Sequence, residues 1–217
     1  RLGPVPMACV DYAVRHRDDA ALAELLEAEA RLEPDSMRAA RLELDAGLAG
    51  LRSGAPREAI IAVLERAFQR EPTTPLLDTR VAEELARLYE EAGRHAEALN
   101  ARKVALKSVI DPREQIVALR VLAMTAERAN ATDDAVLALE RAMMLDGEDE
   151  THLEELDRVL LESQRHDARA VLWLREAARL EDPYKKARAL LISAEAARAG
   201  GNEDDAKANR EAAWLTA

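Results

Sequence analysis

The sequence is poor in aromatic residues, cysteine and glycine. Phe, Trp and Tyr together supply six of its 217 residues, and Cys9 is its only cysteine. A single cysteine excludes an internal disulfide, so nothing supports the disulfide framework of a secreted domain, and we expect Cys9 to pack as a small apolar residue. Eight glycines leave little room for a Gly-rich phosphate loop. These shortages argue against small secreted folds and against nucleotide-binding folds.

Long apolar runs are also missing. No stretch approaches the roughly 18 residues that a membrane span needs, so we expect no membrane insertion within this region. The segment from Leu2 to Val10 contains Pro4 and Pro6 and lacks the pattern of a signal peptide. Because the chain begins with Arg1 and closes inside an expected helix, we expect it to be part of a longer protein. A cytoplasmic location is favoured, and a periplasmic one is left open.

Helix-forming residues dominate what is present. Alanine supplies 45 residues and leucine 31, 48% of the chain is hydrophobic and 34% is charged. This mixture can bury a core, and it favours helices over strands. The net charge of −11 argues against a nucleic-acid partner. Twenty-six arginines against five lysines, with so much alanine, indicate a GC-rich bacterial genome.

Helix-breaking residues recur at regular intervals and divide the chain into helix pairs. Segments of about 14 to 19 residues lie between them, with apolar residues three or four positions apart. The breakers are Pro34, Gly54 to Pro56, Pro72 to Pro75, Gly93, Asp111-Pro112, Gly147, Pro183 and Gly200-Gly201. The predicted pairs span residues 5–32, 35–71, 75–110, 113–146, 149–181 and 184–217. No heptad pattern runs through the breakers, which excludes one long coiled coil.

The second helix of each predicted pair begins with acidic residues followed by an alanine, a small residue suited to a close helix crossing. The alanines taken as equivalent are Ala21, Ala59, Ala98, Ala135, Ala170 and Ala206. They are 38, 39, 37, 35 and 36 residues apart. A second small residue follows seven places later, or eight places later after Ala59. The chain is therefore predicted to be a repeat protein.

The segment Val81–Leu99 closely resembles a tetratricopeptide repeat (TPR). It contains the Leu85-Ala86 pair, Tyr89 one turn later, Gly93 in the turn, and Glu97-Ala98 at the start of the second helix. The resemblance is strongest over residues 40–146, and it departs from the family pattern at Asp157-Arg158, Arg102 and Arg210. It implies an all-α fold, a right-handed α-solenoid of about six antiparallel helix pairs, with residues 1–217 forming one domain.

The sequence contains no motif for catalysis, for a metal or for a cofactor. Phosphate loops, dinucleotide fingerprints, nucleophile elbows and zinc-binding HExxH helices are all missing. His16, His95 and His166 fall at turns, where we expect solvent exposure. The run from Asp146 to Glu150 lacks the ligand spacing of a calcium loop, and we interpret it as an N-terminal cap near Asp149. We therefore predict no enzyme, no metal site and no cofactor.

The resemblance also implies where a partner would bind, because the first helix of each pair lines the concave face in TPR proteins. Carried over by position, the groove candidates are Arg41, Leu44, Leu48, Arg52, Arg80, Arg87, Arg120, Met124, Arg128 and Arg188. The full set of inner positions, which also includes His152, holds eight arginines and seven glutamates in a chain whose net charge is −11. Arginine presents a planar fork that suits carboxylates.

These observations predict a non-catalytic scaffold or adaptor that binds a protein or peptide segment of acidic character in the groove. The alternative is a regulatory sensor region within a larger bacterial signalling or transcription protein. Flanking domains would separate the two, because a DNA-binding or kinase module would favour the sensor. Lys and Asn, which the TPR clamp for chaperone tails uses, do not occur at the inner positions, so a role in binding chaperone tails is disfavoured.

Overall fold

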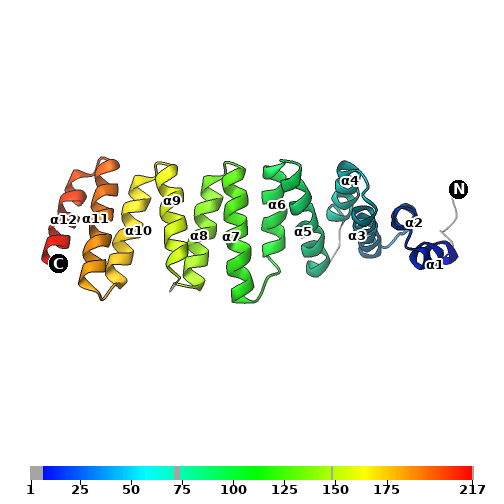
Figure 1. The fold of residues 1–217 in the computed structure, drawn as a ribbon, viewed down its shortest axis with the longest axis horizontal. Helices are drawn as coiled ribbons and strands as arrows, with labels where there is room; N and C mark the ends of the chain where they lie inside the picture. Colours follow the sequence, from blue (N-terminus) through cyan, green and yellow to red (C-terminus); the bar gives the residue numbers. More distant parts are fainter. Residues whose placement is uncertain (1–6, 71–73, 148, 217) are drawn as a thin grey trace. The chain divides into compact units, whose positions relative to one another are not determined.

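A computed structural model describes residues 7–70, 74–147 and 149–216. Over these residues the chain forms twelve α-helices and no strand, joined in chain order by short turns (Figure 1). The all-α prediction and the six helix pairs are thus confirmed. The predicted breaker at Pro72 lies outside the described residues, as do Pro4 and Pro6. No described helix is both long enough and apolar enough to cross a bilayer.

The chain divides into two compact units, residues 1–130 and 131–217. The helices of unit 1 are α1 (Met7–His16), α2 (Asp19–Leu32), α3 (Ser36–Ser53), α4 (Arg57–Phe68), α5 (Pro75–Glu91), α6 (His95–Leu106) and α7 (Pro112–Arg128). Those of unit 2 are α8 (Thr132–Leu145), α9 (Glu150–Glu162), α10 (His166–Arg179), α11 (Pro183–Ala199) and α12 (Glu203–Thr216). The odd-numbered helices are called first helices below, and the even-numbered ones second helices. The single domain over residues 1–217 stays a prediction.

The two kinds of helix begin in different ways. From α3 onward, each first helix is capped by a side-chain oxygen that accepts a backbone N–H of the first turn, and the capping residues are Asp35, Thr74, Asp111, Asp149 and Asp182. The second helices α4, α6, α8 and α10 have no side-chain cap, but each has an acidic residue in its first turn. Carboxylates there interact favourably with the exposed N–H groups of the helix end. The predicted cap at Asp149 is confirmed.

Each turn within a pair contains one residue with positive φ. In unit 1 these are Arg17, Gly54, Gly93 and Asn130, and in unit 2 they are Gln164 and Gly201. A left-handed residue lets the chain reverse directly after a helix, and glycine adopts that conformation without steric strain. The turn positions were predicted from their glycines where glycine is present. Arg17 and Gln164 give no such signal.

Alanine and leucine fill the core of both units. In unit 1 the buried cluster includes Ile61, Leu64, Leu85 and Leu88, with Ala98 fully buried among them. In unit 2 a smaller cluster joins Ala177, Leu190 and Ala213, with Trp173 and Leu180 packed against it. The buried alanines let neighbouring helix backbones approach closely, while the leucines fill the remaining space.

The predicted register of the repeat is wrong by one residue in α4. Ala59 is exposed, and Ile60, 4% exposed, is the buried residue at the helical position of Ala98. With Ile60 in place, the buried Ala67 follows after seven residues, as Ala105 follows Ala98. The irregular eight-residue step disappears. Alanine identity misled the alignment, because α4 fills this crossing with a larger side chain.

Two of the departures from the family pattern are charged residues that form pairs inside their unit. The carboxylate of Asp157 in α9 accepts hydrogen bonds from two guanidinium nitrogens of Arg169, at 2.6 and 3.1 Å, and another from the indole N–H of Trp173. The carboxylate of Glu90 in α5 accepts hydrogen bonds from two guanidinium nitrogens of Arg102, each at 3.2 Å. An ion pair thus replaces an apolar contact between the two helices of a pair at both places.

Candidate functional site

The candidate surface lies on the first helices, where one small motif recurs. Arg41 is the sixth residue of α3, Arg80 the sixth of α5, and Arg188, in unit 2, the sixth of α11. All three are exposed, and none forms an ion pair with a described residue. Four residues earlier, on the same helix face, each follows an exposed apolar side chain, and these are Met37, Leu76 and Tyr184. The sequence reasoning named the arginines and missed their apolar neighbours.

The surface continues along the first helices of unit 1 with a mixed character. Leu48 of α3 is half-buried, while Val117 and Met124 of α7 are exposed. Met124, a predicted groove residue, is 53% exposed. Apolar side chains that are exposed to water in this way can contact a partner segment.

Other predicted groove arginines already have partners. Arg52 donates to Asp19 at 2.9 Å, which joins α3 to α2. Arg87 donates to Glu84 at 3.0 Å and to Glu91 at 2.8 Å on its own helix. These contacts leave both side chains about half exposed. They are available to a partner only in competition with a carboxylate of this chain.

Arg128 of α7, but not Arg120, is among the groups whose charges act on Glu90. Arg120 is half-buried and engaged with another group, and Arg128 is exposed. Burial opposes ionisation of Glu90, but hydrogen bonds from Arg102 and from the Thr125 hydroxyl, with the charges of Arg102 and Arg128, lower the pKa of its carboxyl. The Thr125 hydroxyl donates at 2.7 Å. Arg128 therefore helps to hold a negative charge within unit 1.

Leu44 and His152 do not belong to an exposed groove. Leu44 is 2% exposed and packs in the core of unit 1 with Leu64 and Leu85. His152 is fully buried at the start of α9. The family resemblance, carried over by position, placed both on the inner stripe, but both are buried, so the prediction that they meet a partner is corrected. The prediction for Cys9 is also corrected: it was expected to pack in the interior, and it is exposed.

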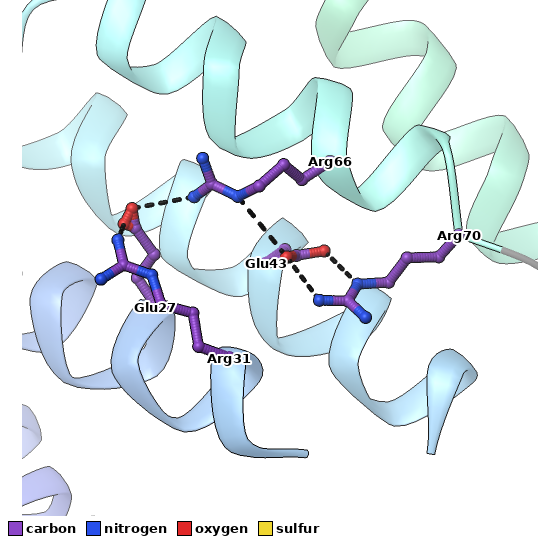
Figure 2. A network of polar contacts seen from close by, with 5 residues as sticks. All are labelled: Glu27, Arg31, Glu43, Arg66 and Arg70. Atoms are coloured by element: carbon purple, nitrogen blue, oxygen red, sulfur yellow. Dashed lines mark hydrogen bonds and ion pairs between the residues drawn. The ribbon is translucent and has the colours of Figure 1, made fainter. Parts of the chain in front are cut away.

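A buried carboxylate organises the helices behind this surface (Figure 2). Glu43 of α3 is 1% exposed and accepts two hydrogen bonds from Arg70, at 2.6 and 2.8 Å. The Nε atom of Arg66 lies 3.6 Å from the same carboxylate. Arg66 also donates to Glu27 of α2 at 2.9 Å, and Arg31 donates to Glu27 at 3.0 Å. The network connects α2, α3 and the end of α4, so it fixes the helix that presents Arg41.

Tyr89 anchors the next pair in a similar way. Its hydroxyl donates to Glu65 of α4 at 2.7 Å, and the guanidinium of Arg94 lies 4.5 Å from its ring centre. Burial, with the hydrogen bond to Glu65, raises the pKa of the Tyr89 phenol. Arg94 donates to Glu65 as well, at 3.2 Å. The aromatic residue that the family resemblance predicts in α5 thus joins α5 to α4.

Unit 2 contains a groove that the sequence did not predict. It has a volume of about 720 Å³ and lies between α8 and α10, with Leu156 and Leu160 of α9 among its lining residues. Met143, Met144, Val171 and Leu172 make its walls apolar, and its charged lining residues are Glu140, Asp167, Arg175, Glu176 and Arg179. Its lining residues come from three helices and from Gly147 in the turn between α8 and α9, so no spacing within one helix brings them together.

Of the three turn histidines, His16 agrees with its predicted exposure, whereas His95 and His166 differ from it. His16 is exposed and lies against Tyr12, with ring centres 4.1 Å apart. His95 and His166 are only half exposed at their turns. His152 meets Asp146 and Asp149 in one cluster, the only group of three potential metal-ligating side chains found within the described residues.

Comparisons with known proteins give structural similarity only. No family model matches the sequence, and no curated protein matches it. A tetratricopeptide repeat protein from Parabacteroides merdae is similar at 17% identity and a TM-score of 0.48, over 97% of this chain and 92% of that one. MamA is similar at 17% identity and a TM-score of 0.44, over 82% and 91%. YrrB, a TPR protein with an unusual peptide-binding site, is similar at 15% identity and a TM-score of 0.43, over 89% and 93%.

The chain's own structure agrees with the family resemblance in Val81–Leu99. Leu85, Ala86, Tyr89 and Ala98 are all buried, and Gly93 adopts a positive φ in the turn between them. These residues of Val81–Leu99 therefore have the burial and the turn conformation that the resemblance implies for them. In its helix pairs, its turns and its buried small residues, the fold of this chain is similar to that of tetratricopeptide repeat proteins.

Proposed function

We propose that this chain is a non-catalytic interaction scaffold that binds a segment of a partner protein along the first helices of unit 1. One observation carries the proposal: Arg41 and Arg80 are exposed at equivalent positions of α3 and α5 and form no ion pair with a described residue. Acidic residues outnumber basic ones, 42 to 31. Within the part of the chain that the structure describes, these two equivalent arginines have no carboxylate partner, so each can bind one from outside.

The neighbouring apolar residues supply the other half of the site. Met37 and Leu76 lie one helical turn before the two arginines and are exposed, as are Val117 and Met124 of α7. Burying such side chains stabilises a complex by about 25 cal/mol for each Å² of apolar surface removed from water. A partner segment that alternates apolar and acidic residues would fit this surface.

The acidic character of the partner follows from the arginines. A guanidinium binds a carboxylate through two parallel hydrogen bonds, which fixes orientation as well as charge. The net charge of −11 repels an acidic protein at long range, and salt screens that repulsion. We therefore expect short-range recognition at the arginines, with only a weak loss of binding in moderate salt.

The test is charge reversal at the two arginines. Arg41→Glu/Arg80→Glu should abolish capture of the partner from cells of the source organism, with circular dichroism unchanged because both side chains are exposed. Arg141→Glu/Arg210→Glu is the matched control, since these arginines are exposed on second helices, form no ion pair with a described residue and change the net charge equally.

Hydrogen exchange on the complex would then locate the partner. Protection of α3 and α5 supports the proposal. Undiminished capture by Arg41→Glu/Arg80→Glu would contradict it, and so would protection confined to the α8–α10 groove of unit 2.

A further inference from the structure

Three potential metal ligands converge at the turn between α8 and α9, within unit 2. Asp146 ends α8, Asp149 caps α9, and His152 lies in the first turn of α9. One ligand atom from each lies within 4.8 Å of the other two. The Oδ1 atom of Asp149 accepts the backbone N–H of Thr151 at 2.9 Å, while its Oδ2 faces Nε2 of His152 at 3.7 Å. The cap therefore orients this carboxylate towards the histidine.

His152 is the unusual member of the cluster. Its side chain is 1% exposed, and neither ring nitrogen has a hydrogen-bond partner among the described residues. A buried polar group without a partner is unfavourable. The 3.7 Å distance to Asp149 is too long for a hydrogen bond. It is close to the roughly 3.3–3.6 Å that separates two ligands placed tetrahedrally around one ion, at bond lengths of about 2.0–2.2 Å.

The surroundings are suited to a cation with additional water ligands. A cavity of about 290 Å³ is lined by Asp146, Asp149, Glu150, Glu176 and Arg179. Arg179 donates to the carbonyl of Gly147 at 2.8 Å and pairs with Glu176, and Lys185 of α11 pairs with Glu150. Four carboxylates thus face two cations here. The site keeps a negative charge that a divalent cation would neutralise.

We propose that Asp146, Asp149 and His152 bind a divalent first-row transition ion, with Zn²⁺ as the ion to test. An imidazole nitrogen together with carboxylate oxygens suits this class, whereas Ca²⁺ and Mg²⁺ prefer sets made only of oxygen. Water from the cavity completes the coordination. The ion ties the end of α8 to the start of α9, and so links two successive helix pairs. This role is separate from partner binding by the first helices of unit 1.

The test uses the full chain, stripped of metal with a chelator and titrated with ZnCl₂ in a calorimeter. We expect one Zn²⁺ per chain, a raised melting temperature, and visible absorption when Co²⁺ replaces Zn²⁺. Asp149→Asn retains the cap, because asparagine caps as well as aspartate. We expect this variant to bind Zn²⁺ at least about tenfold more weakly. Loss of a residue that only hydrogen-bonds to a metal ligand already weakens binding by about that factor, and loss of a ligand itself should weaken it at least as much. Asp146→Asn should have the same effect.

Asp182→Asn is the matched control. Asp182 caps α11 through the same kind of hydrogen bond, to the N–H of Lys185 at 2.8 Å, and belongs to no such cluster. It should bind Zn²⁺ as the unmodified chain does. The proposal is overturned if the chain binds no Zn²⁺, or if Asp149→Asn and Asp182→Asn bind it equally well. Binding of Ca²⁺ as tight as that of Zn²⁺ would overturn the assigned class of ion.

Discussion

Because the Glu43 carboxylate is buried, we expect substitution of its partner Arg70 to lower the free energy of unfolding more than substitution of Glu43 itself. Arg70→Met would leave Glu43, 1% exposed, with only Arg66 at 3.6 Å. Breaking a buried pair in this way costs about 3–5 kcal/mol, because the remaining charge cannot reach water. Arg66 still compensates in part, so we expect a loss of about 3 kcal/mol in the free energy of unfolding.

The converse substitution should cost less. In Glu43→Met the side chains of Arg70 and Arg66 are left without the carboxylate, but they are 27% and 42% exposed and already reach water. We expect a loss of about 2 kcal/mol, the size of a charged hydrogen-bonded contact. The double variant Glu43→Met/Arg70→Met leaves no buried charge, so its loss should match that of Glu43→Met alone.

Urea denaturation followed by far-ultraviolet circular dichroism measures all three losses. Both tryptophans, Trp173 and Trp214, lie in unit 2, so their fluorescence follows that unit separately. The variants should shift the circular dichroism transition of unit 1. A smaller loss of unfolding free energy for Arg70→Met than for Glu43→Met would contradict this prediction. Additive losses in the double variant would contradict it too, because either result would mean that Glu43 is not left as an uncompensated buried charge.

Three further predictions concern other parts of the fold. Ala98→Phe should overpack a fully buried helix crossing and lower the free energy of unfolding by about 1–3 kcal/mol. Ala59→Phe should be nearly neutral in the same urea assay, because Ala59 is exposed. Equal losses for the two variants would contradict the corrected register. Asp157→Asn weakens the ion pair with Arg169 and the hydrogen bond from the Trp173 indole. We therefore expect the free energy of unfolding to fall by about 1–3 kcal/mol and the tryptophan emission to shift. An unchanged emission spectrum would argue against the contact with Trp173. Because the folded-state pKa of Tyr89 is raised, the unfolded chain loses this proton first as pH rises above about 10, so stability should fall there; Tyr89→Phe should flatten that fall, and a parallel pH profile would refute the assignment.

The sequence predicted local features of the chain well, because their causes are local. Proline and Asp caps define where the first helices begin, as at Asp111 and Asp149. Glycine at Gly54 and Gly93 marks turns that need a positive φ. The segment Val81–Leu99 combines these signals within one pair, and its buried residues are those that the resemblance implies.

The register of α4 shows where such reasoning fails. Ala59 and Ile60 are neighbours, and only contacts with α3 and α5 decide which one is buried. The same holds for the charged departures at Asp157 and Arg102, which look like errors in the pattern. Each is satisfied by a partner twelve residues away on the paired helix. A pattern of hydrophobicity cannot distinguish an ion pair across two helices from an exposed charge.

The sequence by itself determined that this protein is a series of α-helix pairs, because helix ends, turns and apolar periodicity depend on residues a few positions apart. Only the tertiary structure decided which charges are engaged. It paired Arg52 with Asp19 and left Arg41 without an ion-pair partner among the described residues, although both lie on the exposed stripe of α3. It also buried His152 beside Asp149 at the turn between two helices. Burial and pairing depend on contacts between helices, and so the candidate sites could be located only once those contacts were known.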